Sequence, residues 1–137
     1  MQTINLAERF SRITEHWRPK IVAELNGQVV RLVKVQGEFV WHQHADADEL
    51  FYVVRGELRI DFRYGPVTLR AGEMMVVPRG VEHRPVAEAE CELLLFEPAE
   101  VRNTGDVDHP TLTAPRGRCT AGRPAGGPGR RRCSAAA

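Results

Sequence analysis

The chemistry in this sequence is concentrated in three histidines and one glutamate: His42, His44, Glu49 and His83. His42 and His44 are two residues apart in a stretch with strand character, so their side chains point to the same face. Val40 lies in the same alternation and indicates that this face is interior. The following strand pattern puts Glu49 on a mainly apolar face as well.

A buried carboxylate needs a partner, because burying it alone costs several kcal/mol or changes its protonation. Three neutral imidazoles and one carboxylate suit a divalent first-row metal such as zinc, iron, manganese, nickel or copper. That metal would supply the charge that keeps Glu49 ionised. Other interpretations stay open, since each histidine could be an ordinary core residue and Glu49 could lie exposed beside Asp46 and Asp48.

The elements that must position these residues are mostly strands. One short amphipathic helix is expected over residues 5–13, where Asn5 and Glu8 have the form of a capping box and apolar residues recur at helical spacing. From residue 20 the apolar period changes to two, and Asn26-Gly27 predicts a hairpin between strands 20–25 and 28–35. Further strands are expected at 39–44, 49–55, 57–63, 67–69, 73–77, 83–87 and 91–97. Short strands at this spacing predict an all-β antiparallel sandwich or barrel.

The spacing of these residues resembles the two signature motifs of the cupin superfamily. The first is matched by Gly37-x4-His42-Gln43-His44-x4-Glu49-x6-Gly56, and the second by Gly72-x5-Pro78-Arg79-Gly80-x2-His83. The motifs stand in order, separated by residues 57–71. Two departures are visible: four residues rather than five precede His42, and Ala87 stands where the second motif usually ends in Asn.

The resemblance covers about residues 28–97 and is closest to small single-domain bacterial cupins of the conserved-barrel type. It implies an antiparallel jelly-roll β-barrel that holds a divalent metal through His42, His44, Glu49 and His83. Cupins include isomerases and epimerases with Lewis-acid chemistry as well as dioxygenases, so the resemblance leaves the reaction open. We expect a metal-dependent enzyme on a small polar substrate, with Glu49 as a detachable ligand and general base. The alternative is a non-catalytic module that binds a metal or a small ligand.

The charge distribution divides the chain. Net charge is +1 overall, but residues 111–137 contain six arginines and no acid, which leaves a mildly acidic body. We expect three segments: an N-terminal helical segment at 1–19, the barrel at 20–110 and a disordered basic tail at 111–137. The tail could bind a polyanion, have no partner, or be the out-of-frame translation of a gene end, so no nucleic-acid partner is expected.

Cysteine usage and apolar run lengths place the protein in a cellular context. Cys91 lies in an apolar run and is expected to be a buried thiol, whereas Cys119 and Cys133 match neither a zinc ribbon nor a disulfide framework. No membrane span or secretory leader is apparent, so a cytoplasmic protein without a membrane partner is expected. The strands at 20–35 offer an edge for a homodimer. Arg79 and Arg84 border His83 and could hold an anionic substrate or simply be solvated.

Overall fold

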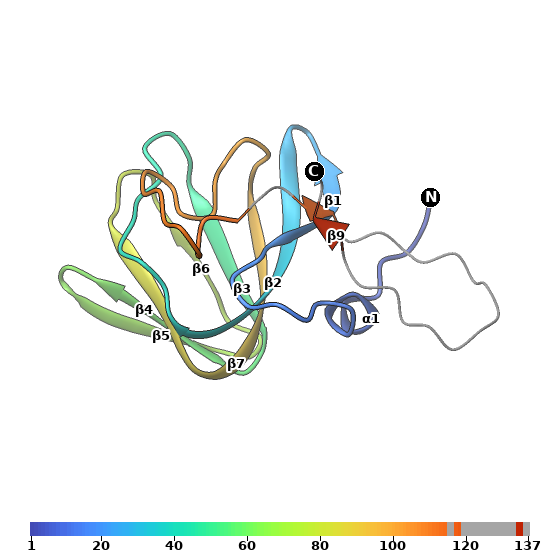
Figure 1. The fold of residues 1–137 in the computed structure, drawn as a ribbon, viewed down its shortest axis with the longest axis horizontal. Helices are drawn as coiled ribbons and strands as arrows, with labels where there is room; N and C mark the ends of the chain where they lie inside the picture. The colour runs from blue at the N-terminus through green and yellow to red at the C-terminus, as the bar shows by residue number, and fades with distance from the viewer. Residues whose placement is uncertain (115–116, 119–133, 136–137) are drawn as a thin grey trace.

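The computed structural model describes residues 1–114, 117–118 and 134–135. It contains one short helix, α1 (Leu6–Phe10), and strands that curl around an interior, with α1 lying beside the body and away from β4 and β5 (Figure 1). The strands are β1 (Lys20–Leu25), β2 (Gln28–Glu38), β3 (Glu49–Arg55), β4 (Glu57–Phe62), β5 (Gly65–Arg70), β6 (Met74–Val77), β7 (His83–Pro98), β8 (Gly117–Arg118) and β9 (Ser134–Ala135).

The helix begins where the sequence predicts. The Asn5 side chain accepts a hydrogen bond from the Glu8 backbone N–H at 3.0 Å, which caps the first turn. The helix ends at Phe10 rather than at residue 13, and a turn follows it. Phe10 and Ile13 still pack together with Leu32 of β2 in a small core of their own.

Strand β7 connects β4 with β2 and β3 in one continuous sheet. Its first part pairs antiparallel with β4, from Phe62↔His83 to Arg59↔Val86. Its second part lies between β2 and β3 and pairs antiparallel with both. On the far sides, β5 pairs with β4, β6 with β3, and β1 with β2. The expected all-β antiparallel jelly-roll barrel is therefore confirmed.

Three of the expected strands differ from the structure. The segments 83–87 and 91–97 form one continuous strand, β7, rather than two. Residues 39–44 form no strand. Beyond Glu38 the backbone pairs with β7 through one hydrogen bond, from the Phe39 N–H to the Pro85 carbonyl, and through an isolated bridge at His42, opposite His83. The hairpin at Asn26-Gly27 is confirmed, and both residues have the positive φ that a tight primed turn requires, 51° and 76°.

The main core fills the interior of the barrel. Its fully buried side chains come mostly from the inward positions of β2, β3, β4 and β7, and include Val35, Val53, Leu58, Ile60 and Leu93. The thiol of Cys91 lies among them, free and buried as predicted. Burial raises its pKa to about 12, so it is held in the neutral form.

The ordered body continues past residue 110. The Asn103 side chain donates to the Leu112 carbonyl at 2.7 Å and accepts from the Ala114 N–H at 2.9 Å. Strand β8 pairs parallel with β1 and antiparallel with β9. The remainder of the predicted disordered tail lies outside the described residues. Within the described part of the chain, no helix is both long enough and apolar enough to span a membrane.

Candidate metal centre

Two of the predicted ligands are clamped together through their backbones. The His42 N–H donates to the His83 carbonyl at 3.0 Å, and the His83 N–H donates back to the His42 carbonyl at 2.9 Å. Each ring then orients itself on the carbonyl two residues earlier: Nδ1 lies 3.0 Å from Val40 O in His42 and 2.9 Å from Val81 O in His83. A carbonyl can only accept, so both rings carry a proton on Nδ1, which leaves Nε2 as the atom that can bind a metal.

The other two ligands complete the cluster. Glu49 is the first residue of β3, where pairing with Val77 of β6 fixes it, and its side chain points inward. Its Oε2 lies 3.1 Å from His44 Nε2 and 3.5 Å from His83 Nε2. All four side chains are buried, with exposed fractions of 6% or less. The structure thus brings together all four residues that the sequence singles out.

The cluster fits a metal ion on two observations. One ligand atom from each residue can be chosen so that all four lie within 4.8 Å of one another. Ligands at about 2.1 Å from one first-row ion lie no more than about 4.2 Å apart, so little contraction is needed. In addition, His83 Nε2 is buried and makes no hydrogen bond with any described residue. A buried polar atom without a partner is rare, and a metal would satisfy it.

The surroundings of His42 and Glu49 shift the pKa of both groups below their ordinary values. Burial, and then the neighbouring His83, lower the pKa of His42 to about 4, so this ring is neutral near pH 7. Burial alone would raise the pKa of Glu49, but the adjoining His44 and His83 outweigh it and hold that pKa well below its ordinary value. A neutral His42 beside an ionised Glu49 has the protonation states that metal binding requires.

A second segment holds the His42–His44 stretch from outside. The Gln43 N–H donates to the Asp106 carboxylate at 3.0 Å, and the Asp106 N–H donates to the Gln43 carbonyl at 3.1 Å. Gly105 packs directly against this backbone with a φ of +54°. A Cβ at Gly105 would stand 2.0 Å from the Gln43 carbonyl oxygen and 3.2 Å from His44 Nδ1. Only glycine fits here, and neither Gly105 nor Asp106 was identified from the sequence.

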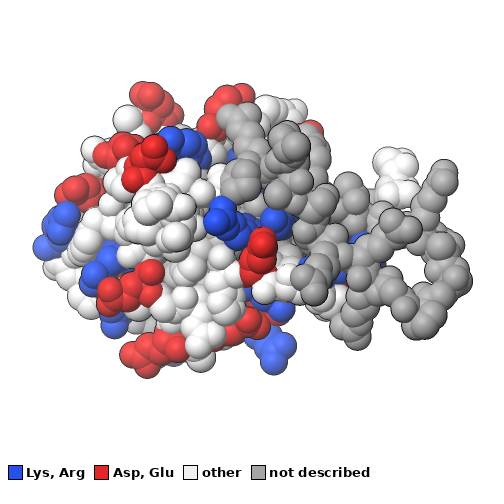
Figure 2. Space-filling model, viewed as in Figure 1, with Lys and Arg blue, Asp and Glu red and all other residues white. Residues whose placement is uncertain are grey.

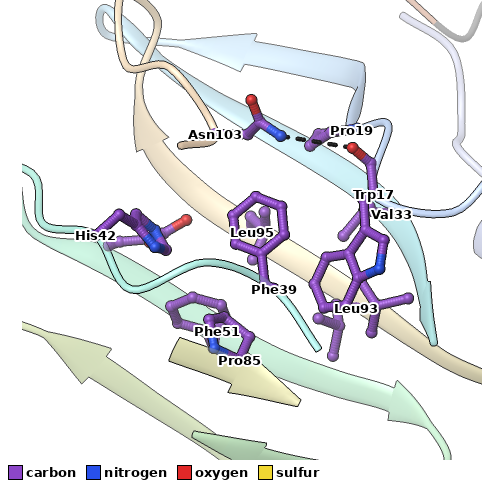
Figure 3. Close-up of a pocket in the computed structure, with 12 residues that line it drawn as sticks. Trp17, Pro19, Val33, Phe39, His42, Phe51, Pro85, Leu93, Leu95 and Asn103 are labelled. Atoms are coloured by element: carbon purple, nitrogen blue, oxygen red, sulfur yellow. Dashed lines mark hydrogen bonds between the residues drawn. The ribbon is translucent and has the colours of Figure 1, made fainter. Parts of the chain in front are cut away.

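A narrow cavity adjoins the centre. It contains about 360 Å³ of empty space, part of it open to solvent, and His42 lies at one end (Figure 3). Glu49, which belongs to the same cluster as His42, also lines it. Its walls are mostly apolar, and they include Trp17, Val33, Phe39, Phe51, Leu93 and Leu95. Phe39 lies between the two ends, stacked on Trp17 at 4.7 Å between ring centroids and edge-on to His42 at 5.3 Å. Phe51 lines the cavity and also belongs to the main core.

The sequence analysis did not predict the buried ion pair between Arg31 and Glu97. Arg31 of β2 donates to the Glu97 carboxylate of β7 and to the carbonyls of Ala99 and Val101. Burial and the nearby charge of Glu49 raise the pKa of Glu97, which Arg31 opposes. Strand alternation could have found both residues, because Arg31 shares its face with buried valines and Glu97 shares its face with buried leucines.

Arg79 and Arg84, which lie on either side of His83 in the sequence, form ion pairs outside the cavity. Arg79 pairs with Asp48 at 3.2 Å on the surface, and this partner lowers the pKa of Asp48. Arg84 pairs with Asp61 at 2.9 Å. Neither arginine lines the cavity, so these contacts favour the solvated alternative over anion binding.

Comparison with known proteins agrees with this geometry. A family model described as a cupin domain matches residues 29–97, half of the chain, and includes both motifs. The chain belongs to the cupin family. It is 52% identical to a solved cupin-2 domain protein from Shewanella frigidimarina, with a TM-score of 0.70 over 70% of this chain and 94% of that one.

Two further relatives give the range of similarity. Protein NMB1881 from Neisseria meningitidis is 40% identical, with a TM-score of 0.66 over 72% of this chain and all of that one. YdbB of Bacillus subtilis is 44% identical over 64 residues, which are 46% of this chain. The match spans 57% of YdbB, less than two-thirds of its length.

Proposed function

We propose that this cupin is a metal-dependent enzyme whose centre is formed by His42, His44, Glu49 and His83. The observation that carries the proposal is the buried Nε2 of His83. It makes no hydrogen bond with a described residue and lies 3.5 Å from the Glu49 carboxylate. Burying three imidazoles and a carboxylate is costly unless they bind something. An adjoining cavity gives a small molecule access to the same groups.

A bound divalent ion would supply either Lewis-acid polarisation of a substrate oxygen or redox chemistry with dioxygen. The protein's own groups do the rest. The Nδ1–H bonds to Val40 and Val81 fix the planes of two rings. Glu49, the only carboxylate among the described residues that line the cavity, is placed to act as a general base toward a bound molecule. The apolar walls exclude water from that proton transfer.

Both reaction classes, isomerase- or epimerase-like and dioxygenase-like, remain within this proposal. The fold alone is shared with a solved hydroquinone 1,2-dioxygenase, PnpCD, determined with Cd²⁺, at 19% identity and a TM-score of 0.57. Fold likeness does not carry a reaction from one protein to another. The choice therefore belongs to assays on this chain.

The test is turnover by protein reloaded with iron, manganese, nickel, copper or zinc in turn. Dioxygen uptake with small phenols and enols tests one class, and isomerisation of small sugars and hydroxy acids tests the other. Glu49→Gln should abolish turnover, whereas His16→Ala, which changes a histidine outside the centre, should not. Metal binding with no turnover in either screen would instead favour a non-catalytic binding module.

We also propose a homodimer, for which the outer face of one sheet is a better candidate than the β1 edge. Strand β8 already pairs with β1 at Ile21. On the outer face, Val76, Leu50 and Phe96 lie side by side across β6, β3 and β7. Figure 2 shows charged side chains of both signs around the body and an uncharged area between them. A mass near 15.4 kDa by light scattering would contradict the dimer.

A further inference from the structure

The walls of the cavity offer a ligand almost no hydrogen bonds. Apart from His42, Glu49 and the indole of Trp17, the polar side chain among the described residues of the lining is that of Asn103. Its amide nitrogen donates to the Leu112 carbonyl at 2.7 Å, and its oxygen accepts from the Ala114 N–H at 2.9 Å. Asn103 is thus engaged in holding residues 112–114, and the metal end is where a ligand can exchange polar contacts.

Trp17 is held at the cavity in a conformation that a bulky residue rarely adopts. Its φ is +59°, the left-handed region. The Trp17 N–H donates to the Lys34 carbonyl and its indole Nε1–H donates to the Gln36 carbonyl, both at 2.9 Å. These bonds lay the ring against Phe39 and leave no free donor on the indole. Such local strain persists where the surroundings fix it, commonly at functional sites.

We infer that the substrate is a small, flat, mainly apolar molecule that carries its oxygen ligands at one end. This inference rests on the proposed metal centre and names the class of molecule that the centre serves. The oxygen-bearing end lies against His42 and Glu49, and the apolar body lies along Phe39 and Trp17 (Figure 3). Aromatic rings pack well against such walls.

The same walls discriminate against a polyhydroxylated molecule. Each hydroxyl that leaves water and meets an apolar wall loses its hydrogen bonds without replacement. A sugar-like ring would lose several at once, whereas a ring with adjacent oxygens at one end loses none that the metal end cannot replace. This inference replaces the small polar substrate expected in the sequence analysis, because the sequence motifs carry no information about the cavity walls.

The test uses two six-membered rings with adjacent hydroxyl groups: catechol, whose remaining edge is apolar, and myo-inositol, which has a hydroxyl on every carbon. Each is titrated anaerobically into the zinc-loaded full chain while the indole N–H signals are followed by ¹⁵N NMR. The chain has two tryptophans; Trp17 lines the cavity, and Trp41 lies under Arg63, outside the lining. Trp41→Phe assigns the two signals without changing a cavity residue.

We expect catechol to shift the Trp17 signal saturably at millimolar concentration and to leave Trp41 unchanged, while myo-inositol at the same concentration shifts neither. Equal shifts of Trp17 by both rings, or no shift by catechol, would overturn the inference. If zinc fails to bind but catechol still shifts the Trp17 signal, the metal proposal fails, and the inference that the cavity binds a flat, mainly apolar molecule is retained. If zinc binds and catechol shifts nothing, the metal proposal stands and the substrate class is wrong.

Discussion

Replacing Gly105 with alanine should weaken metal binding although none of the four predicted ligand residues is replaced. The new Cβ would stand 2.0 Å from the Gln43 carbonyl oxygen, a distance that real structures do not tolerate. The obstacle is backbone, so the segment carrying His44 must move or the 103–107 turn must open. Either movement changes how His44 faces Glu49, across the 3.1 Å contact that helps define the centre.

The magnitude follows from two costs. A non-glycine residue at φ +54° costs about 1–2 kcal/mol, and forcing extra volume into a packed site costs about 1–3 kcal/mol more. Gly105→Ala should therefore destabilise the protein by about 2–5 kcal/mol. Its metal affinity should fall by about 10–100-fold, as is typical when a residue that positions a metal ligand, but does not bind the metal itself, is changed.

Gly27→Ala is the matched control. Gly27 also has a positive φ, +76°, but a Cβ there would meet nothing within 4 Å. It should lose only about 1–2 kcal/mol and bind zinc as the wild type does. Thermal unfolding of the metal-free proteins and competition with a chromophoric zinc chelator measure the two quantities. If the two variants behave alike in both assays, the clamp at Gln43 plays no part in positioning His44.

Three further changes test other parts of the structure. Arg31→Met leaves the Glu97 carboxyl buried without its partner and should cost about 3–5 kcal/mol in urea unfolding, whereas Arg31→Met/Glu97→Leu should recover most of that loss; equal losses would contradict the pairing. Because the pKa of His42 is about 4 in the folded state against 6.5 in an exposed ring, the unfolded chain binds more protons between those values. Metal-free protein should thus lose up to about 3 kcal/mol of stability as pH falls from 6.5 to 4, and His42→Phe should remove that part of the slope. With the other two cysteines changed to serine, Cys91 should resist thiol reagents until the chain unfolds, since it is buried and its pKa is about 12; rapid labelling of native protein would show the site is accessible.

The grouping of the four predicted ligands could be predicted from the sequence because alternation and motif spacing both act locally. His42 and His44 share a face by simple parity, and Glu49 begins a strand whose apolar face includes Phe51. The structure adds a reason for the spacing, since His42 and His83 exchange two backbone hydrogen bonds. The strand expected at 39–44 was wrong, because an isolated bridge between His42 and His83 positions His42 without a continuous run of strand pairing.

The surroundings of the site could not be predicted in this way because they depend on long-range contacts. Trp17 reaches the cavity from the N-terminal segment and Asn103 from a loop after β7, while Gly105 of the same loop packs against Gln43 and His44. Nothing in the spacing of these residues relates them to the two motifs. Arg31 and Glu97 are an intermediate case, since alternation indicates that they point inward but not that they pair.

The most direct test of the central claim is the metal content of untagged protein by mass spectrometry, beside a His42→Ala/His83→Ala double variant. The account predicts close to one first-row metal ion per wild-type chain, either as purified or after reloading, and its loss in the double variant. A wild-type protein that remains metal-free after reloading with zinc, iron, manganese, nickel and copper would contradict it. The three histidines and Glu49 would then be a buried polar cluster without a metal.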